Sequence, residues 1–199
     1  MKIAAAGFRV HSGWTSLVTV ALEKGRPVVL ARLRPRLVAT FSYTFRQPYH
    51  TAAEMSLDEA AAFLDRQRAE ARRLAVAALK STQSDVAQQG YKLTRGALLL
   101  ASGRPLPELS KILAAHSLIH AADGEFFREA LLYACAKCQL VISTTKEREL
   151  FAAASAKLRR SSAALTQFLS ALGKPLGAPW SQDEKFAALA AWLANLPAR

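Results

Sequence analysis

The sequence predicts one α/β domain, residues 1–199, built around a mixed five-stranded sheet. Three apolar segments rich in β-branched residues fill residues 3–41 and are separated by short turns, the pattern of an antiparallel three-strand meander. Helical periodicity then alternates with two further short apolar runs, which predicts two more strands joined through helical connections. A chain of 199 residues is long enough to bury one well-filled core.

The meander is expected to place its strands at residues 3–10, 14–22 and 27–33. The first turn is His11-Ser12-Gly13, and the second, Glu23-Lys24-Gly25-Arg26, has a glycine available for positive φ. Pro27 suits the start of a strand, where its missing N–H is tolerated.

Three arginines recur at every second position at the end of this meander. Arg32, Arg34 and Arg36 would therefore project from one face of an extended chain. We expect the sheet to carry one cationic face or edge.

The rest of the chain, residues 56–160 and 181–195, predicts the order helix, strand, helix, strand, helix, helix. Strands are expected at residues 91–101 and 139–143. Helices are expected at residues 56–80, 107–115, 124–137, 144 to beyond 160, and 181–195. Three of these helices begin at capping boxes, Ser56–Glu59, Thr144–Glu147 and Ser181–Glu184. Residues 42–55, 81–90 and 173–179 are expected to be connections.

The charge distribution points to a polyanionic partner. The chain carries 27 Lys and Arg against 15 Asp and Glu, a net charge of +12. Residues 1–50 hold eight basic residues against Glu23 alone, so +7 of this excess lies there and +5 in the remainder. A basic N-terminal third is typical of nucleic-acid-binding proteins.

Composition also bounds the class of protein. A hydrophobic content of 51% excludes wholesale disorder. Apolar runs are too short to predict a membrane span, and Arg9 interrupts the first one before a signal-peptide core could form. Two cysteines are too few for a disulfide framework. We therefore expect a soluble cytoplasmic protein, and the sequence predicts no particular oligomeric state.

The element order resembles the ribonuclease H-like fold, and two local patterns resemble its Holliday-junction resolvase branch. Val10-His11-Ser12-Gly13 has the form of that branch's first strand end, with His11 in the place of an aspartate. Asp183-Glu184 followed by an alanine-rich helix is similar to the branch's last helix. The resemblance covers about residues 3–195 and implies that the two later strands add parallel to a central first strand.

The resemblance implies two metal ions, Mg²⁺ or Mn²⁺, held by carboxylates of the first strand, the fourth strand and the last helix. It makes Asp183 and Glu184 the metal candidates, and His11, Asp183, Glu184 and a helper such as Glu125 the catalytic candidates. The chain departs from the pattern at His11 and at Ser102, where the fourth strand ends without an acid. Members of this fold also include non-catalytic nucleic-acid and ribosomal modules.

Two of these acids have a second interpretation. Asp183 opens a helix, so it is either a ligand or a complement to the helix dipole. The segment His120–Glu125 is either a site or a polar helix entry.

Zinc is expected to be absent. His116 and His120 are four residues apart, and Cys135 and Cys138 follow, so the four supply zinc-ligand types. Both pairs, however, lie in apolar, helix-patterned sequence without the turns that bring zinc ligands together. The cysteines also lie late in their helix, whereas a redox thiol is favoured at a helix N-terminus.

The leading functional hypothesis is nucleic-acid binding by the N-terminal third, with metal-dependent nuclease activity as its catalytic extension. The basic candidates are Arg32, Arg34, Arg36, Arg46 and Arg104. Aromatic residues interleave with them and suit either base stacking or core packing: Trp14, Phe41, Tyr43, Phe45 and Tyr49. The alternative is a non-catalytic scaffold whose basic surface meets an acidic partner. No phosphate-binding glycine loop or nucleophile elbow is present in the sequence.

Overall fold

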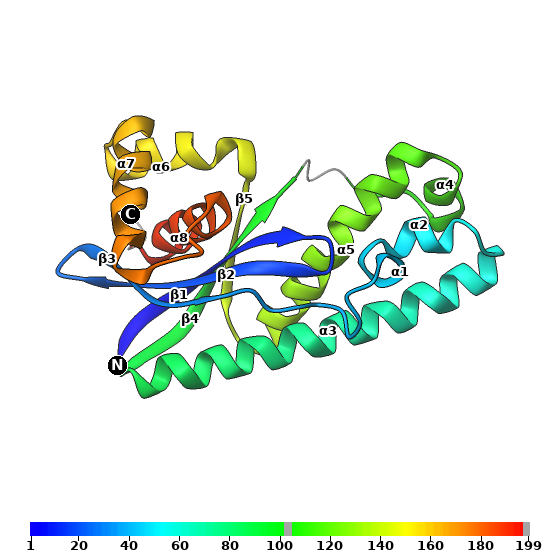
Figure 1. Cartoon of the computed structure of the whole chain (residues 1–199), viewed down its shortest axis with the longest axis horizontal. Coiled ribbons are helices and arrows are strands. Elements are labelled where there is room, and N and C mark those ends of the chain that lie inside the picture. Colours follow the sequence, from blue (N-terminus) through cyan, green and yellow to red (C-terminus); the bar gives the residue numbers. More distant parts are fainter. Residues whose placement is uncertain (102–104, 197–199) are drawn as a thin grey trace.

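The computed structural model describes residues 1–101 and 105–196 and contains a five-stranded sheet in the order β3-β2-β1-β4-β5 (Figure 1). The strands are β1 (Lys2–His11), β2 (Trp14–Glu23), β3 (Arg26–Leu33), β4 (Tyr91–Leu100) and β5 (Val141–Lys146). The first three pair antiparallel, and β4 and β5 add parallel to β1 and to each other. The predicted fold class, an antiparallel meander plus two parallel strands, is confirmed.

The helices are α1 (Tyr43–Arg46), α2 (Pro48–Ala52), α3 (Leu57–Gln88), α4 (Leu109–Leu113), α5 (His116–Lys137), α6 (Leu150–Leu158), α7 (Ser162–Gly173) and α8 (Gln182–Asn195). Two 3₁₀ turns, η1 (Glu147–Glu149) and η2 (Lys174–Leu176), precede α6 and follow α7. In the described part of the chain, none of these helices is both long and apolar enough to cross a membrane.

The sheet separates two apolar cores. Alternate residues of β1 point to opposite faces: Phe8 joins the core under α3 and α5, and Ala5 joins the core under α6, α7 and α8. In Figure 1, α8 lies against the sheet and α3 with α5 runs along the far side. Each face of the central strands is therefore covered by helices, as expected for a sheet with parallel strands.

A glycine allows α8 to reach the sheet. A Cβ atom added at Gly7 would lie 1.8 Å from the carbonyl oxygen of Ala187, so no larger residue fits without moving the helix. Fully buried small residues on α8 continue this close contact, among them Ala187, Ala188 and Ala191. The alanine-rich sequence of α8 is thus explained by packing, and the close approach brings the first turn of α8 to the end of β1.

Several predicted boundaries are wrong for identifiable reasons. Helix α3 continues to Gln88 because Thr82 and Val86 remain on its buried face. Residues 42–55, predicted as a connection, form the short helices α1 and α2. The helical break expected at 120–124 lies at 114–115 instead, because Ile119 and Ala122 already belong to the buried side of α5.

The capping box predicted at Thr144–Glu147 does not form. Parallel pairing of Thr144 with Leu98 and of Lys146 with Leu100 extends β5 through these residues, and the following helix begins only at Leu150. The boxes at Ser56 and Ser181 are confirmed, and in each the backbone N–H of the serine donates to the glutamate three residues later. The error at residue 144 matters because it concealed the role of Glu147.

Candidate functional site

Charged side chains gather where β1 and β5 end and α8 begins. Because the strands run parallel, their carboxyl ends share one edge of the sheet. Arg9 and His11 are two residues apart on β1 and project from the side that faces α8. Glu147 follows β5, and Asp183 lies in the first turn of α8.

Asp183 and Glu147 are both held by β1. One oxygen of Asp183, Oδ1, contacts His11 Nε2 at 2.9 Å and also accepts a hydrogen bond from Arg9 Nη1. The same guanidinium donates to Glu147 through Nε at 3.0 Å and through Nη2 at 2.6 Å. This bidentate hydrogen bond raises the pKa of Arg9. Arg9 is therefore a fixed cation between two carboxylates.

Glu184 is the buried member of the same group. Its Oε2 accepts hydrogen bonds from the backbone N of Ser181 at 2.8 Å and from its hydroxyl at 2.7 Å, and its Oε1 accepts one from Arg34 Nε at 2.7 Å. Burial alone would raise the pKa of Glu184, but these hydrogen bonds outweigh it and lower the pKa. The carboxylate thus remains ionised and paired.

Glu147, Asp183 and Glu184 form what we call the acid cluster. Five of its six carboxylate oxygens accept hydrogen bonds, and the sixth, Asp183 Oδ2, faces Arg34 Nη2 at 3.9 Å. Mg²⁺ and Mn²⁺ require free oxygen ligands in a nearly regular shell. Two guanidinium groups already occupy these positions, so the residues present do not fit the metal pair that the resemblance implied.

The sequence identified part of this arrangement. The structure places the predicted residues His11, Asp183 and Glu184 near one another, and the prediction did not include Arg9 and Glu147. Arg9 could have been found from its position two residues before His11 on the same strand, because side chains two apart point to the same face. Glu147 would have been found at the shared edge if β5 had been predicted to its true end.

Two other predicted residues do not join the acid cluster. Glu125 lies on α5 and pairs with Arg128 at 3.2 Å, while Arg128 donates to the carbonyl of Leu99. The helper role proposed for Glu125 therefore has no contact to support it among the described residues. Arg104 and Ser102 lie outside the described residues.

The predicted row of three strand arginines is only partly correct. Strand β3 ends at Leu33, and Arg32 donates to carbonyl oxygens of Leu176, Gly177, Ala178 and Pro179. Arg34 projects the same way and binds Glu184. Arg32 and Arg34 are thus directed to the segment before α8 and to its first turn, where carbonyl oxygens and a carboxylate accept their hydrogen bonds, whereas Arg36 lies over the ring of Phe41.

An arginine–aromatic patch, comprising Trp14, Arg34, Arg36, Phe41 and Arg46, borders the acid cluster. The guanidinium carbons of Arg36 and Arg46 lie 5.0 and 4.4 Å from the ring centre of Phe41, and that of Arg34 lies 5.1 Å from the Trp14 ring. Trp14 also stacks on His11 at 4.3 Å.

The patch is one continuous surface. Arg36 and Trp14 form a β-bridge, and Arg46 Nε donates to the carbonyl of Ser12 in the β1–β2 turn at 3.2 Å. Tyr43 is exposed beside it, whereas Tyr49 is buried and packs edge-on against Phe126. Phe45 also packs against the core. The predicted aromatic set therefore divides into surface and core members.

The four residues considered as zinc ligands in the sequence lie in two different places in the structure. Cys135 and Cys138 are buried in the core beneath α3 and α5, and burial raises the pKa of Cys135 to about 12. His116 and His120 share one side of α5 and meet His50 of α2. The cysteines are thus packing residues, and the histidines form a separate group.

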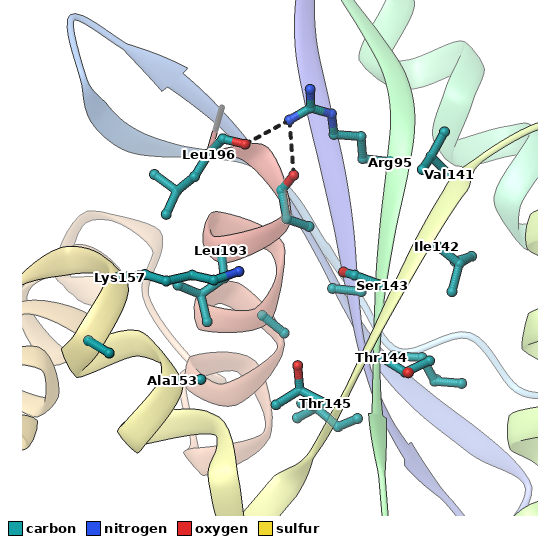
Figure 2. Close-up of a pocket in the computed structure, with 16 residues that line it drawn as sticks. Arg95, Val141, Ile142, Ser143, Thr144, Thr145, Ala153, Lys157, Leu193 and Leu196 are labelled. Carbon is teal, nitrogen blue, oxygen red and sulfur yellow. Dashed lines mark hydrogen bonds between the residues drawn. The ribbon is translucent and has the colours of Figure 1, made fainter. Parts of the chain in front are cut away.

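A pocket of about 820 Å³ opens between β4, β5 and the helices α6 and α8 (Figure 2). Arg95 borders it but donates to the carbonyls of Ala194 and Leu196 at the end of α8. Its described lining contains no Asp, Glu, His or Cys, so it offers no acid–base pair.

With the fold and the acid cluster defined, comparison with solved structures decides the architecture. The chain superposes on Thermus thermophilus RuvC in complex with a Holliday junction substrate with a TM-score of 0.53 and 13% identity, covering 96% of this chain and 90% of that one. It superposes on Thermus thermophilus RuvC alone with a TM-score of 0.50 and 11% identity, covering 95% and 91%. The chain has a ribonuclease H-like fold.

This fold agrees with the ribonuclease H-like fold inferred from the element order, and both similar structures are RuvC, the kind of resolvase that the two local patterns resembled. No protein-family model and no curated protein matches the sequence. The ribonuclease H-like sheet explains why Arg9, His11 and Asp183 meet, since its first strand and last helix adjoin at one edge. The acid cluster departs from the two-metal arrangement by the presence of Arg9 and Arg34.

Proposed function

We propose that this ribonuclease H-like protein binds nucleic acid through the arginine–aromatic patch and does not cleave it. The observation that carries the proposal is the pair Arg36 and Arg46 over Phe41, beside Arg34 over Trp14. Stacking engages the face of a guanidinium and leaves N–H donors on its edge available to phosphate oxygens. The patch therefore presents oriented donors on a chain with a net charge of +12.

The charge of the patch is concentrated on two side chains. Arg34 is paired with Glu184, whereas Arg36 and Arg46 form no ion pair with a carboxylate in residues 1–101 and 105–196. Their contacts are the Phe41 ring and, for Arg46, the carbonyl of Ser12. Two uncompensated guanidiniums next to exposed aromatic rings suit a phosphate backbone.

The acid cluster supports the non-cleaving half of the proposal. In a two-metal nuclease, carboxylate oxygens hold the ions that activate water. Here Arg9 and Arg34 already donate hydrogen bonds to Asp183, Glu147 and Glu184, and His11 contacts Asp183. We assign these residues the task of fixing the end of β1 against α8, which holds Trp14 and Arg34 in place.

Branched DNA is the first ligand to test, because one similar structure is a complex with a Holliday junction substrate. Labelled single-stranded, duplex and four-way-junction DNA, and matched RNA, should be titrated at several salt concentrations. We expect binding whose logarithm falls linearly with the logarithm of salt concentration, since each neutralised phosphate releases counterions. No binding to any of them at low salt would refute the proposal.

Cleavage is tested in the same samples with Mg²⁺ or Mn²⁺. We expect intact nucleic acid, and an unchanged result for Asp183→Asn. Metal-dependent cleavage that is lost in Asp183→Asn would show that the acid cluster opens to metal, and would restore His11, Asp183 and Glu184 as catalytic candidates. The binding claim would then stand while the non-cleaving claim fails.

The scaffold alternative uses the same basic side chains for an acidic protein partner. It differs in its outcome, because a surface specific for a folded acidic partner need not bind simple duplexes with a steep salt dependence. Weaker nucleic-acid binding with a shallower salt dependence in both Arg36→Ala and Arg46→Ala, with an unchanged fold, would favour nucleic acid over the scaffold role.

A further inference from the structure

Three of the four histidines of the chain converge away from the acid cluster. One ring nitrogen of each of His50, His116 and His120 lies within 4.8 Å of those of the other two. The rings of His50 and His120 are 4.5 Å apart, and those of His50 and His116 are 5.4 Å apart. These residues come from α2 and from the first turns of α5, 66 positions apart in the sequence.

The spacing within α5 favours a shared ligand. His116 and His120 are one helical turn apart and therefore lie on one side of the helix. Their Nε2 atoms are 2.9 Å apart. A zinc ion bound at about 2.05 Å in tetrahedral geometry separates two nitrogen ligands by about 3.4 Å. Small rotations of these two exposed rings reach that distance.

A buried carboxylate orients the third ring. Asp123 of α5 is 3% exposed, and its Oδ2 contacts His50 Nδ1 at 2.5 Å. Its Oδ1 accepts a hydrogen bond from the backbone N of Tyr49 at 2.7 Å. With Nδ1 of His50 committed to the carboxylate, Nε2 is the nitrogen left to bind a metal. A carboxylate behind a histidine is the usual outer partner of a metal ligand.

A hydrogen bond between His116 and His120 would explain only the contact between these two rings. It would not explain why Asp123 is buried to fix a third imidazole at the same place. A neutral imidazole has one donor and one acceptor nitrogen, so three acceptor nitrogens that face one another are favourable only when they share a proton or a cation. The geometry points to a site for one first-row divalent transition-metal ion, with Zn²⁺ as its occupant, held by His50, His116 and His120.

This inference departs from the expectation that zinc is absent, which considered His116 and His120 with the cysteines and did not include His50. Imidazole nitrogens suit Zn²⁺ and neighbouring transition metals, whereas Mg²⁺ prefers oxygen. A bound ion would link α2 to α5 and leave one coordination position for water. The site is independent of the proposed nucleic-acid function.

The test uses the untagged full-length chain stripped of metal with a chelator and titrated with Co²⁺ as a spectroscopic probe, then with Zn²⁺ as competitor. We expect one Co²⁺ per chain, visible absorption bands of a low-coordinate ion, and displacement by one Zn²⁺. His120→Gln should weaken binding by at least tenfold, and His50→Gln should do the same. His11→Gln is the matched control, because it removes the one histidine outside the cluster.

Zn²⁺ should also raise the thermal midpoint of the native chain and leave that of His120→Gln unchanged, since a ligand stabilises only the state that binds it. His120 is exposed, so this variant retains the fold, which its metal-free thermal midpoint verifies. Absence of stoichiometric binding overturns the site. So does binding that His50→Gln leaves unchanged, which would indicate only a surface pair, or binding lost in Cys138→Ser but retained in His120→Gln.

Discussion

Two histidine–aspartate contacts of similar length lie at different places in this molecule and serve different purposes. His11 meets Asp183 at 2.9 Å, and His50 meets Asp123 at 2.5 Å. Asp183 is also bound by Arg9, whereas the partners of Asp123 among the described residues are His50 and the backbone of Tyr49. The surrounding cations, and not the contact itself, distinguish the two.

The difference decides what each carboxylate can do. In the acid cluster, a metal ion would have to displace the hydrogen bonds that Arg9 and Arg34 already make to the carboxylate oxygens. Around Asp123, ring nitrogens of His50, His116 and His120 face one another, and among the described residues no Lys or Arg pairs with Asp123. A histidine–aspartate pair therefore belongs to an ion-pair network in one region, and in the other its aspartate orients a histidine of the proposed metal site.

Exchanging each aspartate for asparagine should separate the two regions most clearly. Asp123→Asn keeps an acceptor for Tyr49 but no longer fixes the His50 tautomer, so we expect Co²⁺ affinity to fall by about 10- to 100-fold. Asp183→Asn should leave Co²⁺ affinity unchanged. Spectroscopic titration of both variants gives the answer, and equal losses in the two would contradict the distinction drawn here.

Removing the cation should turn the acid cluster toward metal. Arg9→Met leaves Asp183 and Glu147 without their guanidinium, and we expect the free energy of unfolding to fall by about 2 kcal/mol, between the values for exposed and buried pairs. Mn²⁺ should then raise the thermal midpoint of Arg9→Met and not that of the native chain.

The control for this change is Arg73→Met, which removes an arginine from an exposed pair with Glu70 on α3. Its stability should change by less than about 1 kcal/mol, and Mn²⁺ should have no effect on it. If Mn²⁺ stabilises the native chain as strongly as Arg9→Met, the arginines do not exclude metal and the non-cleaving proposal loses its basis.

The fold could be predicted from the sequence because the residues that mark its turns and helix starts act locally. Gly25 and the Ser12-Gly13 turn separate segments rich in β-branched residues, and the boxes at Ser56 and Ser181 satisfy backbone donors within four residues. Boundaries failed where tertiary pairing overrode local chemistry. Thr144–Lys146 has the chemistry of a helix start, yet pairing with β4 makes it strand.

The candidate site was less accessible because its chemistry depends on distant partners. His11 and Asp183 could be matched by resemblance, but the arginine that neutralises Asp183 is defined only once β1 lies beside α8, which requires Gly7. His50 lay in a segment predicted as a connection, 66 residues before His116. No periodicity in the sequence relates them, so only the packing of α2 on α5 reveals the group.

The arginine–aromatic patch should respond to charge removal more weakly than either aspartate region. Arg36→Ala and Arg46→Ala should each lower nucleic-acid affinity by about threefold to tenfold and reduce the salt slope by about 1, equally for different sequences. Arg66→Ala removes the same charge from an exposed position on α3 and should change neither quantity. Equal effects of all three would mean that net charge, and not the patch, governs binding.

The smallest expected effect is a pH dependence of stability that belongs to Glu184. Hydrogen bonds from Ser181 and Arg34 outweigh burial and hold the pKa of Glu184 below its usual 4.5. A carboxyl with a lowered pKa in the folded state stabilises the fold above its unfolded pKa, and this stabilisation is lost as pH falls through the folded value.

The free energy of unfolding by urea, measured from pH 6 to pH 3, should therefore change less with pH for Glu184→Gln than for the native chain. We expect the difference to be about 1 kcal/mol, the usual net contribution of one hydrogen bond. Glu129→Gln, which removes a carboxylate from a half-buried pair with Arg72 away from the acid cluster, is the comparison variant. A native slope in Glu184→Gln would show that Arg34 and Ser181 do not hold this carboxylate, and the acid cluster would then lack its buried member.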